Sequence, residues 1–551
     1  MKNKNILKNK NVDRDIEIYD TTLRDGTQGE GFSLSLDDKL MIADILDELG
    51  VQFIEGGYPL SNQKDNKFFE LSSKKKYINS KITAFGSTKK KNCKASSDAG
   101  LLTLSGLDVK YITIFGKSWD LHVKEILKAS CEENLELIAD SINFLKQNGK
   151  IVFFDAEHFF DGFKNNEEYS VKTVQSALSS GAEKVVLCDT NGGTLPHEII
   201  NIINKLSDFY NIDVNRLGIH AHNDTDCAVA NTLSAVLCGV SHVQGTINGY
   251  GERTGNANLS TIIPNLELKL GLTCIPENKL RDLTKVSHLI DEISNNIPVK
   301  NKPYVGESAF AHKAGIHANA VLKNPSSYEH IEPSLVGNAR RFLISDLSGK
   351  GNIEAKAKEL GFDLSRINEE QEKALLNKIK EMEDNGFNFE SADGSFKMLL
   401  NKYSSEKYNN YFKLISFKVI IEKSLLENTA EYNENNYNIL SEAAVTLNIN
   451  GKIEHTSAIG SGPVNALDNA LRKSLLIFYP VLNEMKLSDF KVRVINGRNM
   501  KSGTGSFVRV LIESSDKVSK WTTIGVSENI IEASYQALAD SINYKLIKEN
   551  I

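Results

Sequence analysis

Short β-rich runs alternate with longer amphipathic stretches along the first half of the chain. From Ile16 to about Leu270, each run of β-branched and aromatic residues is followed by a polar or glycine-rich loop and then by a helical pattern. This alternation predicts βαβ units and a parallel sheet. The predicted strands are Ile16–Thr22, Phe53–Pro59, Ile82–Ser87, Tyr111–Phe115, Ile151–Asp155, Lys184–Asp189, Leu217–His222 and Val243–Asn248.

Eight strand-plus-helix units in about 250 residues are typical of a (β/α)8 TIM barrel. A doubly wound open sheet shows the same alternation and is the alternative. We expect the α/β barrel to be the catalytic domain, over residues 16–279, after a disordered lead-in over residues 1–15.

The pattern changes after Gly271. Amphipathic helices are predicted over Leu280–Ser294 and Glu369–Asp384, with glycine-rich turns between them. We therefore expect a small α-rich linker region over residues 280–410.

The last part of the chain contains an internal repeat. Ser457-Ala-Ile-Gly460, with a predicted helix over Val464–Leu475, is similar to Thr522-Thr-Ile-Gly525, with a predicted helix over Ile531–Ile542. Two copies of a strand–strand–helix unit predict a pseudo-symmetric α+β domain over residues 411–551. We expect this domain to have a regulatory role.

The composition of the 551 residues excludes several classes of protein. With 40% apolar residues, 25% charged residues and no apolar run long enough to span a bilayer, the chain is typical of a globular protein that does not enter the membrane. A net charge of −6 gives no general attraction for nucleic acid. The basic N-terminus has no apolar segment behind it, and the six cysteines form no Cys-x-x-Cys pair. These features predict a cytoplasmic protein with reduced thiols.

Polar residues follow several of the predicted strands, which is where the active site of a TIM barrel lies. His220 and His222 are two positions apart, so a strand places both imidazoles on one face, about 6.6 to 7 Å apart along it. With the Asp25 carboxylate and the Asn256 amide oxygen they make a mixed N/O donor set, which favours Mg²⁺ or Mn²⁺ and also allows Zn²⁺. A His-x-His pair that merely packs inside the strand is the alternative.

Three further polar residues lie at the same predicted end of the barrel. Arg24 could hold a carboxylate or a developing oxyanion through charge-assisted hydrogen bonds. Glu157 could orient a substrate or polarise a base, and Thr190 could bind a substrate carboxylate. The alternative for each is an ordinary side chain at the rim of the barrel.

Two glycine-containing loops are candidate binding sites. Gly249 and Gly251 follow the eighth strand and could let backbone N–H groups approach a phosphate-bearing cofactor. Gly460, Ser461 and Gly462 open a helix and could seat the carboxylate of an effector. A simple turn with a helix cap explains the second loop equally well.

Three separated motifs now point to one family. Asp20-Thr-Thr-Leu-Arg-Asp-Gly26, His220-Ala-His-Asn-Asp224 and Gly251-Glu-Arg-Thr-Gly-Asn256 stand in the order and spacing of the 2-isopropylmalate synthase family, which also holds homocitrate and citramalate synthases. The chain resembles this family over about residues 16–551, because the C-terminal repeat is similar to its LeuA-type allosteric dimerisation domain. The segments Thr21–Ser33 and Ile54–Asp65 are similar to the citramalate synthase branch.

The resemblance implies an acyltransferase that carries out a metal-dependent Claisen-type condensation. Its substrates would be acetyl-CoA and pyruvate, and its products (R)-citramalate and CoA, on a route to 2-oxobutanoate and isoleucine. The resemblance also implies a homodimer with isoleucine as feedback inhibitor.

Carried over to this sequence, the resemblance makes Arg24 the group that stabilises the enolate or keto oxygen. His317 would be the base, assisted by Glu157 and Tyr328, and both His317 and Tyr328 would act in the barrel of a neighbouring subunit. Ala318-Asn319 stands where the family often has Gln-Asp. Residues implied for the metal are Asp25, His220, His222 and Asn256.

Three other functions compete with this interpretation. A sibling enzyme would use 3-methyl-2-oxobutanoate to make 2-isopropylmalate, with leucine as inhibitor. An acyl-CoA lyase would use a related barrel but generally lacks the linker and the doubled C-terminal domain. A non-catalytic amino-acid sensor is disfavoured because the set of candidate catalytic and metal residues is complete.

Overall fold

A computed structural model describes residues 15–344, 350–363, 367–404, 410–425, 437–495 and 506–549. The chain forms two compact units, one of residues 1–310 with 331–339 and one of residues 311–330 with 340–551. Residues 1–14 of the predicted lead-in lie outside the described residues. Among the described residues, no helix has the length and apolar character needed to cross a membrane.

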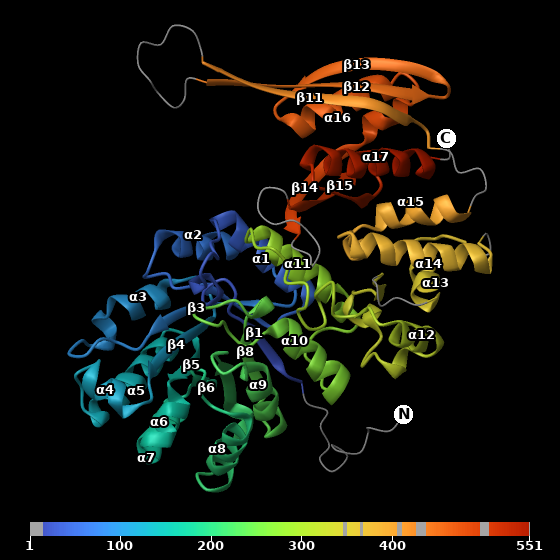
Figure 1. Cartoon of the computed structure of the whole chain (residues 1–551). Coiled ribbons are helices and arrows are strands. Elements are labelled where there is room, and N and C mark those ends of the chain that lie inside the picture. The colour runs from blue at the N-terminus through green and yellow to red at the C-terminus, as the bar shows by residue number, and fades with distance from the viewer. Residues whose placement is uncertain are drawn as a thin grey trace. The chain divides into compact units, whose positions relative to one another are not determined.

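The first unit contains a closed barrel of eight parallel strands (Figure 1). Strand β1 pairs with both β2 and β8, which closes the sheet and excludes the doubly wound alternative. Each predicted strand is present, with small changes at its ends. The strands are β1 (Glu17–Asp20), β2 (Phe53–Gly57), β3 (Lys81–Ser87), β4 (Tyr111–Lys117), β5 (Ile151–Glu157), β6 (Lys184–Asp189), β7 (Leu217–Ala221) and β8 (His242–Gly245).

Helices connect these strands and surround the barrel (Figure 1). Several begin with side-chain caps, as in α1, where Ser35 and Asp38 form a capping box, and α5, where Ser130 and Glu133 do so. The helices are α1 (Leu36–Leu49), α2 (Gln63–Ser72), α3 (Ala99–Gly106), α4 (Asp120–Glu125), α5 (Cys131–Gln147), α6 (Phe159–Asn165), α7 (Glu167–Ser179), α8 (Pro196–Asp208), α9 (Ala228–Leu237), α10 (Leu259–Pro264) and α11 (Leu283–Ile293).

Aromatic rings fill the N-terminal end of the barrel. Tyr19, Phe53 and Phe153 are almost fully buried and pack against Tyr111. The Lys81 ammonium lies over the rings of Phe53 and Tyr111, at 5.0 and 5.1 Å from their centroids. This end is a packed core, so space for a ligand remains at the opposite end.

The second unit begins with short elements and helices, whereas the helix predicted over Leu280–Ser294 is α11 of the first unit, so the bounds of the predicted linker stay a prediction. Helix α14 has the predicted bounds. The elements are β9 (Ala311–His312), α12 (Gly315–Lys323), β10 (Arg341–Phe342), α13 (Lys350–Glu359), α14 (Glu369–Asp384) and α15 (Asp393–Ser404).

The C-terminal half of the second unit confirms the predicted repeat. Each copy has three antiparallel strands followed by a helix, one strand more than predicted. Thr456 Oγ1 donates to Ala470 O at 2.9 Å, and in the other copy Thr523 Oγ1 donates to Ala537 O at 2.7 Å. The elements are β11 (Lys413–Leu425), β12 (Tyr437–Ile449), β13 (Lys452–Gly460) and α16 (Pro463–Leu475), then β14 (Lys486–Ile495), β15 (Phe507–Ser515), β16 (Lys520–Ser527) and α17 (Ile530–Lys548).

Candidate active site

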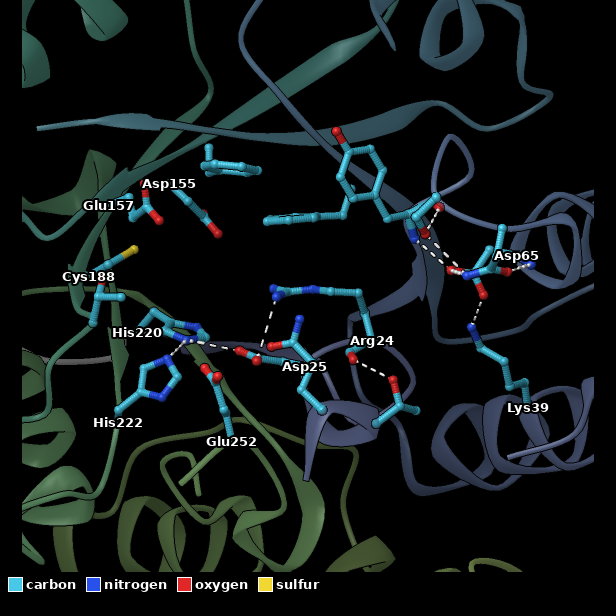
Figure 2. A pocket seen from close by; sticks show the side chains of 18 of the residues that line it. Arg24, Asp25, Lys39, Asp65, Asp155, Glu157, Cys188, His220, His222 and Glu252 are labelled. Atoms are coloured by element: carbon cyan, nitrogen blue, oxygen red, sulfur yellow. Dashed lines mark hydrogen bonds and ion pairs between the residues drawn. The ribbon is translucent and has the colours of Figure 1, made fainter. Parts of the chain in front are cut away.

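A cavity of about 480 Å³ lies at the C-terminal ends of the barrel strands (Figure 2). Its lining comes from the loops after most of the strands, so residues far apart in the sequence meet there. Six of the residues predicted from the sequence line it together: Arg24, Asp25, Glu157, Thr190, His220 and His222.

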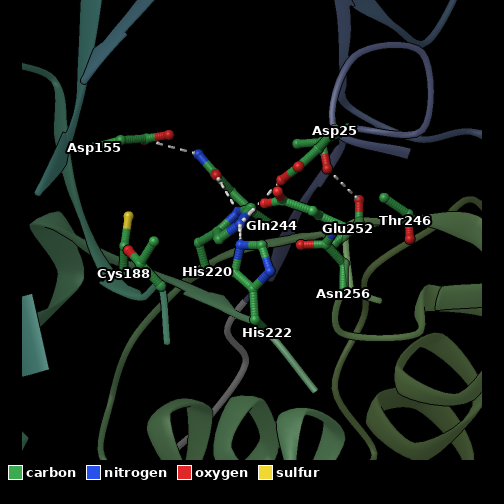
Figure 3. Close-up of polar contacts among 12 residues, drawn as sticks. Asp25, Asp155, Cys188, His220, His222, Gln244, Thr246, Glu252 and Asn256 are labelled. Carbon is green, nitrogen blue, oxygen red and sulfur yellow. Dashed lines mark hydrogen bonds and ion pairs between the residues drawn. The ribbon is translucent and has the colours of Figure 1, made fainter. Parts of the chain in front are cut away.

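The candidate metal ligands converge at the floor of this cavity (Figure 3). His220 Nε2 lies 3.2 Å from Asp25 Oδ2 and 3.3 Å from His222 Nε2, and all three side chains are buried. The ligand atoms of the three residues lie within 4.8 Å of one another. Adjacent ligands of an octahedral cation, each about 2.1 Å from it, are about 3 Å apart, so this spacing fits a divalent metal ion.

Asn256 supplies a further observation in favour of a cation. Its Nδ2 donates to Tyr250 O at 3.1 Å, whereas its buried Oδ1 has no hydrogen-bond partner within the described residues. The backbone of Asn256 bridges to that of His222. A buried amide oxygen without a donor is costly unless a ligand completes it, which agrees with the predicted role of Asn256 as an oxygen ligand.

The electrostatics of the centre favour metal-binding protonation states. Burial raises the pKa of Asp25, but Arg24 and the His220 hydrogen bond outweigh it and hold that pKa well below its usual range. Burial lowers the pKa of His220, but its hydrogen bond to Asp25 raises it overall. Burial and the neighbouring His220 lower the pKa of His222 to about 4. A cation would therefore meet an ionised Asp25 and a neutral His222, and it would replace the hydrogen bond between His220 and Asp25.

Arg24 is held rigidly beside the metal ligands. Its Nε and Nη2 donate to the two carboxylate oxygens of Glu55 at 2.5 and 3.3 Å, and its Nη1 lies 3.6 Å from Asp25 Oδ1. The guanidinium also lies over the Phe85 ring, 3.9 Å from its centroid. Phe85 in turn stacks on Phe115 at 5.4 Å. These contacts fix the orientation of the Arg24 guanidinium before any substrate binds.

Thr190 and Glu157 lie at the rim of the cavity and each has a defined partner. The His158 N–H donates to Thr190 Oγ1 at 2.9 Å, and His158 takes a left-handed conformation with φ of 56°. Thr190 can therefore direct its own hydroxyl hydrogen to a ligand. Glu157 forms an ion pair with Lys117.

Gln244 and Asp155 are among the residues of the site that were not predicted from the sequence. Gln244 Oε1 lies 3.0 Å from His220 Nδ1, and its Nε2 donates to Asp155 Oδ1 at 3.1 Å. Burial raises the pKa of Asp155 to about 7, with His220 opposing and Glu55 adding to the shift. A signal was available in the alternation of β5, because Asp155 stands two positions before Glu157 and shares its face.

The glycines of the loop after β8 do not line the cavity. A Cβ added to Gly251, whose φ is +158°, would lie 2.1 Å from Asn256 Nδ2. A Cβ on Gly249 would lie 3.3 Å from Asn256 O. The structure gives these glycines a packing role beside Asn256, and their predicted cofactor contact stays a prediction.

The remaining predicted residues belong to the second unit. His317, on α12, and Tyr328 stack with ring centroids 4.1 Å apart. A Cβ on Gly460 would lie 2.3 Å from Ala466 N, and Ser461 N donates to Asn465 Oδ1 at 3.1 Å. Gly462 is the N-cap residue of α16. The catalytic and allosteric roles of these residues stay predictions.

Three family models match consecutive parts of the chain. The HMGL-like model matches residues 15–290, and the homocitrate synthase post-HMGL domain-like model matches residues 304–387. The LeuA allosteric (dimerisation) domain model matches residues 390–546.

Curated relatives extend the similarity to nearly the whole chain. The 2-isopropylmalate synthase of Methanocaldococcus jannaschii is 32% identical over 99% of this chain and 97% of its own length. The (R)-citramalate synthase of Geobacter sulfurreducens is 50% identical, and that of Aquifex aeolicus 51%, each over 97% of this chain and 98% of the relative. Because about half of its residues are identical to those of (R)-citramalate synthases over nearly its whole length, the chain belongs to the (R)-citramalate synthase family.

Proposed function

We propose that this protein condenses acetyl-CoA with pyruvate to give (R)-citramalate and CoA. The observation that carries the proposal is the meeting of Asp25, His220 and His222 beside the fixed guanidinium of Arg24, in one cavity. The high identity to (R)-citramalate synthases supports the choice of reaction.

The residues of the centre would hold a divalent cation, with Mg²⁺ or Mn²⁺ favoured by the mixed N/O donors and Zn²⁺ also compatible. Bound there, such an ion polarises the ketone of the 2-oxoacid as a Lewis acid. The proposed ligands are Asp25, His220, His222 and Asn256.

The chain's own side chains account for the remaining steps. A base takes a proton from the methyl group of acetyl-CoA, and the resulting enolate carbon attacks C2 of pyruvate. The keto oxygen becomes an alkoxide, which then takes up a proton, returned by the protonated base, to give the hydroxyl. Arg24 stabilises the negative oxygen that forms, and Thr190 donates to the substrate carboxylate. Water then cleaves the thioester and releases CoA.

The base in this proposal is His317, with Tyr328 stacked on it and Glu157 assisting. We propose that His317 and Tyr328 act in the barrel of a neighbouring subunit, so that a homodimer is the active form. Residues 16–279, 280–410 and 411–551 remain our proposed catalytic, linker and allosteric domains. Light scattering of the full chain tests the dimer.

Aromatic side chains support pyruvate over a larger 2-oxoacid. Phe85 and Phe115 are nearly parallel, with an interplanar angle of 14°, and both line the cavity. Such a wall leaves room for a methyl group more readily than for an isopropyl group, and each added methylene costs about 1–3 kcal/mol in a pocket that does not fit it. The Phe115→Val variant should raise the use of 3-methyl-2-oxobutanoate relative to pyruvate about 10-fold.

The test of the reaction is CoA thiol release from acetyl-CoA with pyruvate, 3-methyl-2-oxobutanoate and 2-oxoglutarate offered separately, with Mg²⁺, Mn²⁺ or a chelator. Preference for pyruvate that the chelator abolishes is expected. Preference for 3-methyl-2-oxobutanoate would move the protein to 2-isopropylmalate synthesis. Metal binding without turnover on any 2-oxoacid would favour the lyase or the sensor.

For the C-terminal domain we propose feedback inhibition by isoleucine at the loop Gly460–Gly462. Gly462 has extended backbone, and a Cβ added there meets no atom within 4 Å. Gly462→Ala should therefore fold normally and yet take up space that an effector bound at this loop would need. Weaker inhibition by isoleucine in this variant is expected, and unchanged inhibition would place the effector elsewhere.

A further inference from the structure

The two histidines of the metal centre differ in how their second ring nitrogen is held (Figure 3). His220 Nδ1 lies 3.0 Å from Gln244 Oε1. His222 Nδ1 is buried and has no hydrogen-bond partner among the residues that the structure describes. Among the described residues, only His220 therefore has a neighbour that can determine which ring nitrogen carries the hydrogen.

The constraint on His220 continues to a second residue. Gln244 is fully buried in β8, opposite His220 in the β7–β8 register. Its amide has two possible orientations, and the choice decides whether oxygen or nitrogen faces His220. Asp155 Oδ1, 3.1 Å from Gln244 Nε2, accepts a hydrogen bond whether or not the other carboxyl oxygen carries a proton. The amide nitrogen is thereby directed to Asp155 and the amide oxygen to His220.

We infer that Gln244 and Asp155 are positioning residues that set the tautomer of His220. With Gln244 Oε1 as its neighbour, His220 Nδ1 has to carry a hydrogen, so Nε2 is the nitrogen whose lone pair a metal ion would take, in place of the hydrogen bond to Asp25. Hydrogen bonds of this kind orient a metal-bound imidazole and raise its basicity. The inference rests on the metal centre of the proposed function and adds to it a pair of residues that need not touch the metal or the substrate.

Asp155 does not contact His220 through a hydrogen bond of its own but fixes the orientation of the Gln244 amide. Without an acceptor at position 155, the Gln244 amide is free to turn and to donate from Nε2 to His220 Nδ1. That orientation places the imidazole hydrogen on Nε2, where it blocks coordination. Asparagine at position 155 keeps a carbonyl oxygen for Gln244 and removes only the charge.

The experiment measures Mn²⁺ affinity of the full-length protein without substrates, from the electron paramagnetic resonance signal of free Mn²⁺. Gln244→Leu should raise the dissociation constant about 10- to 100-fold, and Asp155→Ala about 10-fold. Asp155→Asn should stay within about twofold of the unmodified protein.

Gln52→Leu is the matched control. Gln52 is also a barrel glutamine bonded on both sides, since it accepts from Ile18 N and donates to Cys274 O, each at 2.8 Å. It lies outside the cavity lining, so its loss should leave Mn²⁺ affinity unchanged.

Each remaining outcome has a defined meaning. A folded Gln244→Leu protein with the original affinity would overturn the inference, and so would equal losses in Asp155→Ala and Asp155→Asn, because charge rather than hydrogen-bond geometry would then matter. If Gln244→Leu does not fold, the two Asp155 variants decide. Absence of Mn²⁺ binding in the unmodified protein would overturn the metal centre itself.

Discussion

The two ends of the barrel use the same eight strands for opposite purposes. At the N-terminal end, the rings of Tyr19, Phe53 and Phe153 are buried and pack with centroids 5.1 to 6.1 Å apart. At the C-terminal end, charged side chains such as the buried Asp25 and the partly buried Arg24 line a cavity. The residues that stabilise the barrel and those proposed for the chemistry thus lie at opposite ends of it. Substitutions at one end should mainly change stability, and those at the other end should mainly change turnover.

The largest effect is expected from removing a metal ligand. Asp25→Ala should lower CoA release on the order of 10³-fold, because several kcal/mol of transition-state stabilisation by the cation are lost. The melting temperature should change little. Asp37→Ala, on the exposed first turn of α1, is the control for loss of an aspartate. An Asp25→Ala protein that retains most of its turnover would contradict the assignment of the chemistry to the C-terminal end of the barrel.

A substitution at the other end should reverse this pattern. Phe153→Ala should destabilise the barrel by about 3–5 kcal/mol, since it leaves a cavity among tightly packed rings. Turnover per folded molecule should be unchanged. Thermal unfolding monitored by circular dichroism, with CoA release measured well below the transition, checks both parts. Lost turnover at full stability would show that the aromatic end serves the chemistry directly.

Tyr19 packs at the N-terminal end and its hydroxyl reaches toward the C-terminal end. Its variant should therefore show smaller losses of both stability and turnover. The Tyr19 hydroxyl donates to Glu55 Oε2 at 3.1 Å and lies 2.7 Å from Thr113 Oγ1, and Glu55 holds Arg24. Tyr19→Phe should cost about 1 kcal/mol of stability and lower turnover by less than about 10-fold. A change in only one of the two quantities would show that the hydroxyl does not couple the ends.

The smallest expected effect is an opposite response of the two ends to pH in metal-free protein. Burial lowers the pKa of His242 although Glu17 opposes it, so the unfolded chain binds this proton more readily and stability rises with pH up to about 6.5. Burial raises the pKa of Asp20 to about 7, so the folded state binds that proton more readily and stability falls as pH rises from about 4 to 7.

Melting temperatures of His242→Gln and Asp20→Asn across pH 5 to 8 separate these contributions. His242→Gln should lose part of the rise in stability with increasing pH. Asp20→Asn should lose part of the fall in stability with increasing pH. Profiles that remain parallel to that of the unmodified protein would show that neither buried group titrates during unfolding.

The sequence predicted the barrel well because strands buried on both faces form β-branched runs with clear ends. Lys184–Asp189 matches β6 at both ends. The first strand of each C-terminal repeat was missed. In β11, a register shift between Leu414 and Ser416 interrupts the alternation of partly buried and exposed positions, and Ile420 and Ile421 are both exposed, so the alternation is too short to mark the strand.

The active site was predictable where its polar residues end a predicted strand or directly follow one. His220 and His222 share a strand face, and Arg24 adjoins Asp25. Gln244 lies 24 positions from His220 and 89 from Asp155, and strand register alone brings the three together. Without the barrel's closure, nothing in the sequence pairs these residues.

The packing of Gly251 against Asn256 has a genetic consequence. Every amino-acid change that one base substitution can make in a glycine codon adds a Cβ, and a Cβ here would lie 2.1 Å from the Asn256 amide. Any substitution at Gly251 therefore requires the Asn256 side chain to move. The proposed metal centre thus depends on Gly251, which has no side chain, as well as on the side chains that would bind the ion.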